Sequence, residues 1–152
     1  MAGLEGNIRN IHGDIRDFDK LRQSVETASP DIVIHMAAQA IVRESYSAPR
    51  YTYETNVMGT VNILESIRLL NKEQICALNI TTDKVYKNNE WCWGYRETDA
   101  LDGYDPYSNS KSCSELVTDS YKNSFFYDGS GVAVSTARAG NVIGGGDFAS
   151  DR

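Results

Sequence analysis

Two residues whose types and spacing could support proton transfer are Tyr107 and Lys111, which stand four positions apart. Asp105 is a residue type that caps helices and Pro106 suits a first turn, so we expect a helix to begin here. Residues four apart share one helix face, where the ammonium would favour ionisation of the phenol. Tyr107 is therefore a candidate general base. The alternative is an ordinary helix start, and the pair alone favours that alternative.

The composition is that of a globular protein, with 152 residues, 41% hydrophobic and 24% charged residues, and a net charge of −6. The length allows one domain, and the negative charge argues against nucleic acid or an anionic membrane as the main partner. Cys76, Cys92 and Cys113 show neither disulfide nor metal-ligand spacing. This pattern favours a reducing, cytoplasmic setting without a metal site. No apolar run approaches a membrane span, and the N-terminus lacks a signal-peptide pattern.

The elements that must position these residues follow from hydrophobic periodicity and turn signals. We expect strands over residues 7–11, 31–35, 74–80 and 132–137, helices over 16–28, 49–70 and 106–126, and a loop over 85–104. Strands that alternate with helices are typical of parallel α/β architecture. The fold class we predict is a partial Rossmann-like parallel sheet flanked by helices.

Polar or small residues follow each expected strand. They are Asp14, residues 35–38, residues 82–84 and residues 138–141. In parallel sheets, ligands bind outside the carboxyl ends of the strands. We therefore expect Tyr107 and Lys111 to belong to a ligand-binding site at this edge of the sheet.

Five motifs occur in order, and together they resemble an extended short-chain dehydrogenase/reductase, specifically a nucleotide-sugar 4,6-dehydratase. The motifs are Gly13-Asp-Ile-Arg16, His35-Met-Ala-Ala38, Thr82-Asp-Lys-Val-Tyr86, Tyr107-Ser-Asn-Ser-Lys111 and Ala139-Gly-Asn-Val-Ile-Gly-Gly-Gly-Asp147. The Asp-Lys pair after Thr82 and the glycine-rich ending are most similar to the CDP-glucose 4,6-dehydratase group. Single motifs are weak signals, whereas the ordered set is specific.

The resemblance implies a reaction for these residues. In the family, a tightly held NAD oxidises the sugar 4-hydroxyl, water is lost across carbons 5 and 6, and the hydride returns at carbon 6. By position, Tyr107 would be the base at the 4-hydroxyl. Lys111 would lower the pKa of that tyrosine and hold the nicotinamide ribose. Thr82 would hydrogen-bond the 4-oxygen, and Asp83 would protonate the departing 6-hydroxyl. The substrate would be a nucleotide hexose, most closely CDP-glucose.

Lys84 departs from the family pattern, because many related dehydratases have Glu there as the base that removes the carbon-5 proton. A lysine can do this only as a free amine, so its pKa would have to fall from about 10.4 through burial or a cationic neighbour. Lys111 and bound NAD are the candidate sources of that positive potential. The alternative is that Lys84 pairs with a substrate phosphate or with an acid such as Asp83.

The resemblance also implies further ligand contacts. Asp14 and Ile15 would lie against the adenine ring, although Asp14 could instead cap the following helix. Other cofactor contacts are implied at Ala37, Ala38 and Gln39. The small side chains would let the dinucleotide approach closely, and core packing is the alternative explanation. Asn141, in the glycine-rich loop, is implied as a substrate contact, with a simple turn as its alternative.

Several other residues have two interpretations. Asn56 is expected to face inward from an apolar helix and satisfy buried backbone groups near the site. Arg138 is either part of a core-edge ion pair or a phosphate ligand. Trp91 and Trp93 are expected to cover apolar surface, with contact to a nucleobase as the alternative.

The family's glycine-rich cofactor motif, G-x-x-G-x-x-G, does not occur in this sequence. We therefore expect residues 1–152 to form an incomplete NAD-binding Rossmann domain, lacking its first two strands and the substrate domain. The strand over 32–35 would then be an exposed sheet edge. The resemblance implies a homodimer through helices 50–70 and 106–126. Two alternatives are a truncated, non-catalytic binding or dimerising remnant, and an epimerase or reductase on the same scaffold.

Overall fold

The computed structural model describes residues 7–70 and 72–146 of the chain. In this part of the chain, three parallel strands form a sheet in the order β1-β2-β3. The strands are β1 (Ile32–His35), β2 (Ile75–Thr82) and β3 (Val132–Ala139). The predicted parallel sheet flanked by helices is confirmed.

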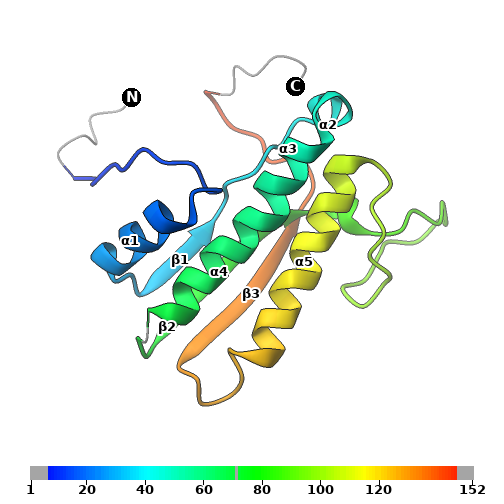
Figure 1. Ribbon diagram of the computed structural model, residues 1–152. Helices are drawn as coiled ribbons and strands as arrows, with labels where there is room; N and C mark the ends of the chain where they lie inside the picture. Colours follow the sequence, from blue (N-terminus) through cyan, green and yellow to red (C-terminus); the bar gives the residue numbers. More distant parts are fainter. Residues whose placement is uncertain (1–6, 71, 147–152) are drawn as a thin grey trace.

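Helices pack mainly on one face of this sheet. They are α1 (Phe18–Ala28), α2 (Val42–Ser47), α3 (Pro49–Tyr53), α4 (Gly59–Leu69) and α5 (Pro106–Ser124). Figure 1 shows α4 and α5 side by side across the sheet, and α1 packs against α4. A π-helical turn (Glu54–Met58) joins α3 to α4, so the helix predicted over 49–70 is one path with a wider turn inside it.

The strand predicted over residues 7–11 is wrong, because the structure has no strand there. Ile8 and Ile11 are 59% and 46% exposed. An isolated strand is unstable without a partner and a buried face. In the described residues β1 pairs only with β2, so no partner receives this segment.

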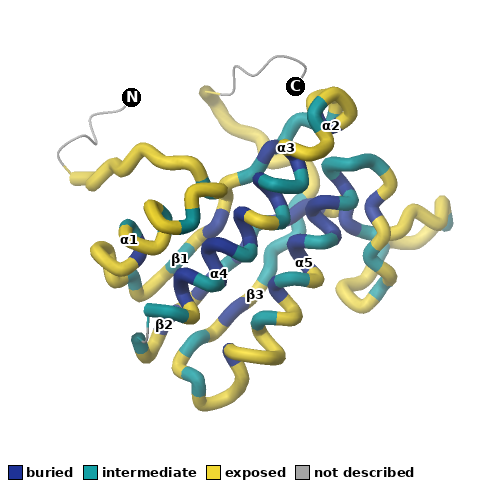
Figure 2. Tube along the Cα trace, viewed as in Figure 1, coloured by how far each residue is buried: buried dark blue, intermediate teal, exposed yellow. Residues whose placement is uncertain are grey.

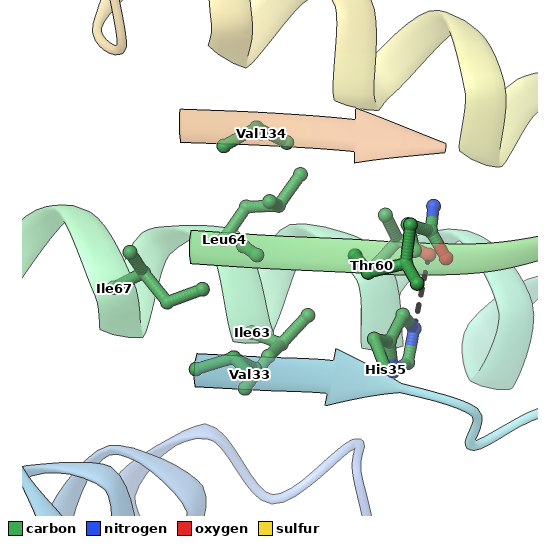
Figure 3. Close-up of a pocket in the computed structure, with 10 residues that line it drawn as sticks. Val33, His35, Thr60, Ile63, Leu64, Ile67 and Val134 are labelled. Atoms are coloured by element: carbon green, nitrogen blue, oxygen red, sulfur yellow. Dashed lines mark hydrogen bonds between the residues drawn. The ribbon is translucent and has the colours of Figure 1, made fainter. Parts of the chain in front are cut away.

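The apolar core lies between the sheet and the helices α1 and α4. Figure 2 shows the buried stretch of α4 facing the strands. Leu64 and Ile67 are each 2% exposed, and the other core members are Val25, Ile63, Ile75, Ala77, Phe126 and Val134. A small cavity of about 10 Å³ remains between α4 and the sheet. Figure 3 shows His35 at one end of it, pointing toward Thr60.

The strand β1 is the exposed edge that the sequence predicted. Val33 and His35 face the helices, whereas Ile32 and Ile34 point the other way and are 68% and 56% exposed. Alternate side chains of a strand point to opposite faces, so one face of this edge is apolar and open to solvent. Asp147, the last residue of the glycine-rich motif, lies outside the described residues.

Candidate active site

A cleft of about 770 Å³ opens where β2 and β3 end, between the segment after β1 and the start of α5. It brings together six residues predicted to act in the site: Ala38, Thr82, Lys84, Tyr107, Lys111 and Asn141. These residues come from four separate stretches of the chain. The parallel topology gathers them at one edge of the sheet, as expected for α/β proteins.

The start of α5 fixes Tyr107. The Asp105 carboxylate accepts hydrogen bonds from the Ser108 N–H at 3.0 Å and the Ser108 hydroxyl at 2.5 Å. The predicted cap at Asp105 and first turn at Pro106 are therefore confirmed. Gly103 packs under this turn so closely that a Cβ there would lie 2.3 Å from the Ser108 carbonyl carbon.

Lys111 is a buried cation beneath the cleft. Its side chain is on a residue only 4% exposed, and its Nζ donates to the Ile80 carbonyl oxygen at 2.9 Å. Burial lowers the pKa of Lys111 to about 8, while the nearby Glu115 charge acts in the opposite direction. Burial thus favours the neutral amine of Lys111, whereas the Glu115 charge favours its ammonium form.

A short 3₁₀ turn (Asp83–Val85) follows the end of β2, and Thr82 is its N-cap. The Thr82 hydroxyl donates to Asp83 Oδ1 at 3.1 Å and accepts the Lys84 N–H at 3.4 Å. Lys84 Nζ lies 3.8 Å from the same Asp83 oxygen, and both side chains are about half exposed, at 47% and 60%. The other Asp83 oxygen would lie 3.3 Å from a Cβ at Gly140. Asp83 does not line the 770 Å³ cleft but stands beside it.

Asn56 joins two walls of the site. Its Oδ1 accepts the Gln39 N–H at 2.8 Å, and its Nδ2 donates to the Gln39 carbonyl at 3.0 Å and to Ser110 Oγ at 2.8 Å. This confirms that Asn56 satisfies buried backbone groups. The Gln39 side chain is bonded to the main chain of Ile41, at 2.6 and 3.0 Å, while Ala37 is exposed.

Asp14 and Ile15 lie apart from the main cleft. Asp14 lines a second, open cleft of about 550 Å³ with Arg16 and Asn62 among its neighbours. The Arg16 guanidinium grips the Asp14 carboxylate at 2.7–3.2 Å and lowers the pKa of Asp14 to about 2. The residue that caps α1 is Asp17, which accepts the Lys20 N–H at 3.1 Å. Capping by Asp14, one of the two alternatives, is therefore wrong.

Two residues of α4 contact the segment that contains Ile15 and Arg16. Neither was predicted from the sequence. Asn62 Nδ2 donates to the carbonyl oxygens of Ile15 and Arg16 at 2.9 and 3.3 Å. A Cβ at Gly59 would lie 2.9 Å from Ile15 Cγ2. A glycine and an inward amide within an apolar helix are the only sequence signals of this contact.

Arg138 belongs to an ion pair, which decides between its two interpretations. Its Nη2 lies 3.0 Å from Glu115 Oε2, and the Glu115 side chain is 5% exposed. Trp91 stacks with Trp93 and makes a tilted contact with Tyr95, at 5.3 Å between ring centroids in both pairs. Glu115 was missed, although it follows Lys111 by four residues on the same helix.

In residues 7–70 and 72–146, the His, Cys, Asp and Glu side chains form no group of three that would hold a metal ion. None of the helices in these residues has the length and hydrophobicity needed to span a membrane.

The sequence is similar to known nucleotide-sugar enzymes. The family model described as GDP-mannose 4,6 dehydratase matches residues 2–142. A CDP-glucose 4,6-dehydratase from Salmonella typhimurium is 56% identical over 144 residues, covering 92% of this chain and 40% of that protein. A CDP-paratose 2-epimerase from Salmonella typhi is 31% identical over 160 residues, covering 95% of this chain and 45% of that protein. The chain therefore spans less than half the length of these relatives.

Solved structures share the fold. A dTDP-glucose 4,6-dehydratase from Streptomyces venezuelae, solved with NAD bound, superposes with a TM-score of 0.76 at 27% identity over 89% of this chain and 40% of that one. A UDP-glucose 4-epimerase from Brucella ovis, also in complex with NAD, gives a TM-score of 0.68 at 27% identity over 84% and 37%. The ordered motifs, the parallel sheet and the family match agree. The chain belongs to the GDP-mannose 4,6-dehydratase family of extended short-chain dehydrogenases/reductases.

Proposed function

We propose that this chain carries the catalytic centre of a nucleotide-sugar 4,6-dehydratase, a hydro-lyase of deoxysugar biosynthesis that acts on CDP-glucose. One observation carries the proposal. Thr82, Lys84, Tyr107 and Lys111 line a single cleft at the strand ends. They do so in a chain 56% identical to a CDP-glucose 4,6-dehydratase.

The residues of the cleft fit NAD as the cofactor. Ala38 and Ile80 give the cleft small and apolar walls, and Lys111 supplies a buried cation suited to ribose hydroxyls. Asp14 and Ile15 are the proposed adenine contacts, with Ala37 and Gln39 beside the dinucleotide. When bound, NAD would supply the hydride acceptor and donor of the reaction.

The first chemical task of the protein is to take the proton from the sugar 4-hydroxyl. Tyr107 is the proposed base, and the Lys111 ammonium four residues on stabilises its phenolate. The Thr82 hydroxyl, which now donates to Asp83 at 3.1 Å, would turn to the 4-oxygen. Asn141 contributes a polar group on the opposite wall, toward the substrate.

The second task is the loss of water across carbons 5 and 6. Asp83 is the proposed acid that gives a proton to the departing 6-hydroxyl, and Lys84 is the proposed base at carbon 5. The 3.8 Å contact between Lys84 Nζ and Asp83 Oδ1 pairs an ammonium with a carboxylate, so the elimination requires that a proton first pass from Lys84 to Asp83. The contact equally suits a lysine that only pairs with Asp83. The two roles can be distinguished because only a base at carbon 5 would be needed for exchange of that proton with solvent.

A second candidate function is epimerisation, which the 31% identical CDP-paratose 2-epimerase favours. An epimerase on this scaffold uses the tyrosine and lysine without an elimination step. The acid and base at Asp83 and Lys84 favour the dehydratase. A truncated, non-catalytic remnant that binds or dimerises is the third possibility, and it predicts no turnover.

The proposal includes a cytoplasmic homodimer. The three cysteines Cys76, Cys92 and Cys113 are free thiols, which suits a reducing compartment. The outward faces of the helix path over 50–70 and of α5 lie side by side and carry apolar residues such as Val61 and Leu116. We propose that two copies pack through these faces, within an NAD-binding Rossmann domain to which residues 1–152 contribute.

A graft tests the proposed function. This chain replaces the matching segment of the Salmonella typhimurium relative, and the product formed from CDP-glucose and NAD is identified by NMR. A 4-keto-6-deoxy product supports the dehydratase. A sugar epimerised without loss of water supports the second candidate, and a graft that binds NAD without turnover supports the remnant.

A further inference from the structure

Glu115 is a buried carboxylate to which the proposed reaction assigns no role. It is 4% exposed and continues the four-residue steps of Tyr107 and Lys111 along α5. Its carboxylate accepts hydrogen bonds from Thr81 Oγ1 on β2, from Thr136 Oγ1 at 2.9 Å and from Arg138 Nη2 at 3.0 Å. A charge buried this deeply is costly unless it is paired, and here donors from two strands satisfy it.

Arg138 extends this cluster to the aromatic segment, which we define as residues 86–97. Its Nη1 donates to Tyr86 Oη at 2.9 Å and to the Glu97 carbonyl at 3.1 Å, so one guanidinium holds both ends of the segment. The guanidinium also lies 4.9 Å from the centroid of the Tyr86 ring, which stacks on Tyr95 at 5.1 Å. The aromatic segment leaves the turn that carries Lys84 and returns toward the start of α5.

The same carboxylate acts on the cation beneath the cleft. Lys111 precedes Glu115 by one helical turn, and the Glu115 charge raises the pKa of Lys111 against the effect of burial. On β1, burial lowers the pKa of His35, and the positive charge of Lys111 lowers it further. On β3, Arg138 is paired with Glu115. On β2, Thr81 contributes only a hydroxyl to this cluster.

We propose that Glu115 is a positioning residue of the site: it anchors the aromatic segment through Arg138 and places a buried carboxylate one helical turn from Lys111 on α5. One carboxylate can do both because α5 packs against β2 and β3, and Arg138 on β3 reaches the aromatic segment. The proposal rests on the proposed function only for its consequence on turnover. Anchoring and charge are properties of the chain itself.

Tryptophan fluorescence tests the anchor directly. The chain has 2 tryptophans, Trp91 and Trp93, and both lie in the aromatic segment, so quenching by acrylamide reports that segment alone. In Glu115→Gln and Arg138→Met we expect the quenching constant to rise about two-fold, because the segment opens locally. The control is Arg22→Met, which breaks the exposed Arg22–Glu26 pair at 2.8 Å on α1 and should leave quenching unchanged.

Arg138→Lys keeps the test decisive if the other variants fail to fold. It keeps a cation for Glu115 but loses the planar fork that reaches Tyr86 and Glu97, so quenching should still rise. Folded variants that quench like the wild type overturn the anchor. An Arg138→Lys chain that does not fold assigns Arg138 to stability alone and overturns it as well.

The charge on Lys111 is read by NMR titration of the ¹³C-labelled lysine side chain. We expect Glu115→Gln to lower the Lys111 pKa by about one unit and Glu115→Asp to restore it. An unchanged titration in folded Glu115→Gln overturns this part of the proposal. If both readouts behave as expected and the graft still fails to turn over, the dehydratase assignment fails and the role of Glu115 stands.

Discussion

Lys84 is the residue on which the proposed elimination depends most. In this structure its ammonium lies 3.8 Å from Asp83, so acid and base candidates share one turn. If Lys84 removes the carbon-5 proton, Lys84→Met in the graft should slow solvent deuterium incorporation at carbon 5 by about 100-fold. NMR of the product formed in D₂O measures the rate. Incorporation at the wild-type rate would show that Lys84 only pairs with Asp83 or the substrate.

His35 makes the stability of the chain depend on pH. The side chain is 7% exposed, and burial lowers its pKa from 6.5 to about 4, with a smaller effect of the Lys111 charge. Between these values the unfolded state binds more protons than the folded state, so acid destabilises the fold.

The free energy of unfolding should therefore fall by about 2 kcal/mol between pH 7 and pH 5. Urea denaturation at the two pH values measures this change. His35→Gln should remove most of it. A wild-type chain as stable at pH 5 as at pH 7 contradicts a buried, neutral His35.

Individual residues differed in how far the sequence could predict them. Asp105 could be assigned because a helix cap depends on residues three positions away. Glu115 could not, because its donors Thr136 and Arg138 become neighbours only when β3 joins the sheet. The same holds for Asn56, whose orientation was predicted but whose partner Ser110 comes from another helix.

The start of α5 depends on Gly103. Its backbone is not left-handed, so the requirement for glycine comes from close packing. A Cβ at Gly103 would lie 2.3–2.7 Å from three backbone atoms of Ser108 and Asn109, which have no side-chain freedom to move away. Gly103→Ala should therefore destabilise the protein by about 3 kcal/mol, measured by urea denaturation.

Gly94 provides a matched control in the neighbouring loop, since a Cβ there would meet nothing within 4 Å. We expect Gly94→Ala to change the free energy of unfolding by no more than about 0.5 kcal/mol. Equal effects of the two substitutions would contradict the close packing under α5.

Elements were predictable where local patterns matched the tertiary structure. The β-branched run of β1 and the capped start of α5 carried such patterns. The short helix α2 was missed because the residue before it, Ile41, offers no side-chain cap. The π-turn over Glu54–Met58 left the apolar periodicity of the helix path nearly intact, so one continuous helix was expected. Residues 7–11 show alternation of apolar and polar residues, but such a segment forms a strand only when a partner strand pairs with it.

At the scale of the whole molecule, the described residues leave apolar side chains open to solvent on the sheet and on the helices. One such surface is the face of β1 that carries Ile32 and Ile34. Another is the outward side of the paired helices, where Leu116 is 57% exposed. The helix surface is the one we propose for the dimer.

A charge on that surface should separate the copies. We expect the chain to sediment as a dimer and Leu116→Glu to sediment as a monomer, because a desolvated, unpaired carboxylate is costly. Analytical ultracentrifugation measures the mass. Ile143→Glu, at a residue 94% exposed outside the helix pair, is the control and should leave the mass unchanged. A dimer that survives Leu116→Glu would place the interface elsewhere.

We propose above all that Tyr107, in the capped first turn of α5 and four residues before Lys111, is the base of a dehydratase. The most direct measurement compares kcat and NAD affinity of the graft with and without Tyr107→Phe, which removes only the phenolic oxygen. We predict that kcat for CDP-glucose falls by about 10²–10⁴-fold while NAD is still bound. A Tyr107→Phe graft that turns over CDP-glucose at the wild-type rate would contradict the account.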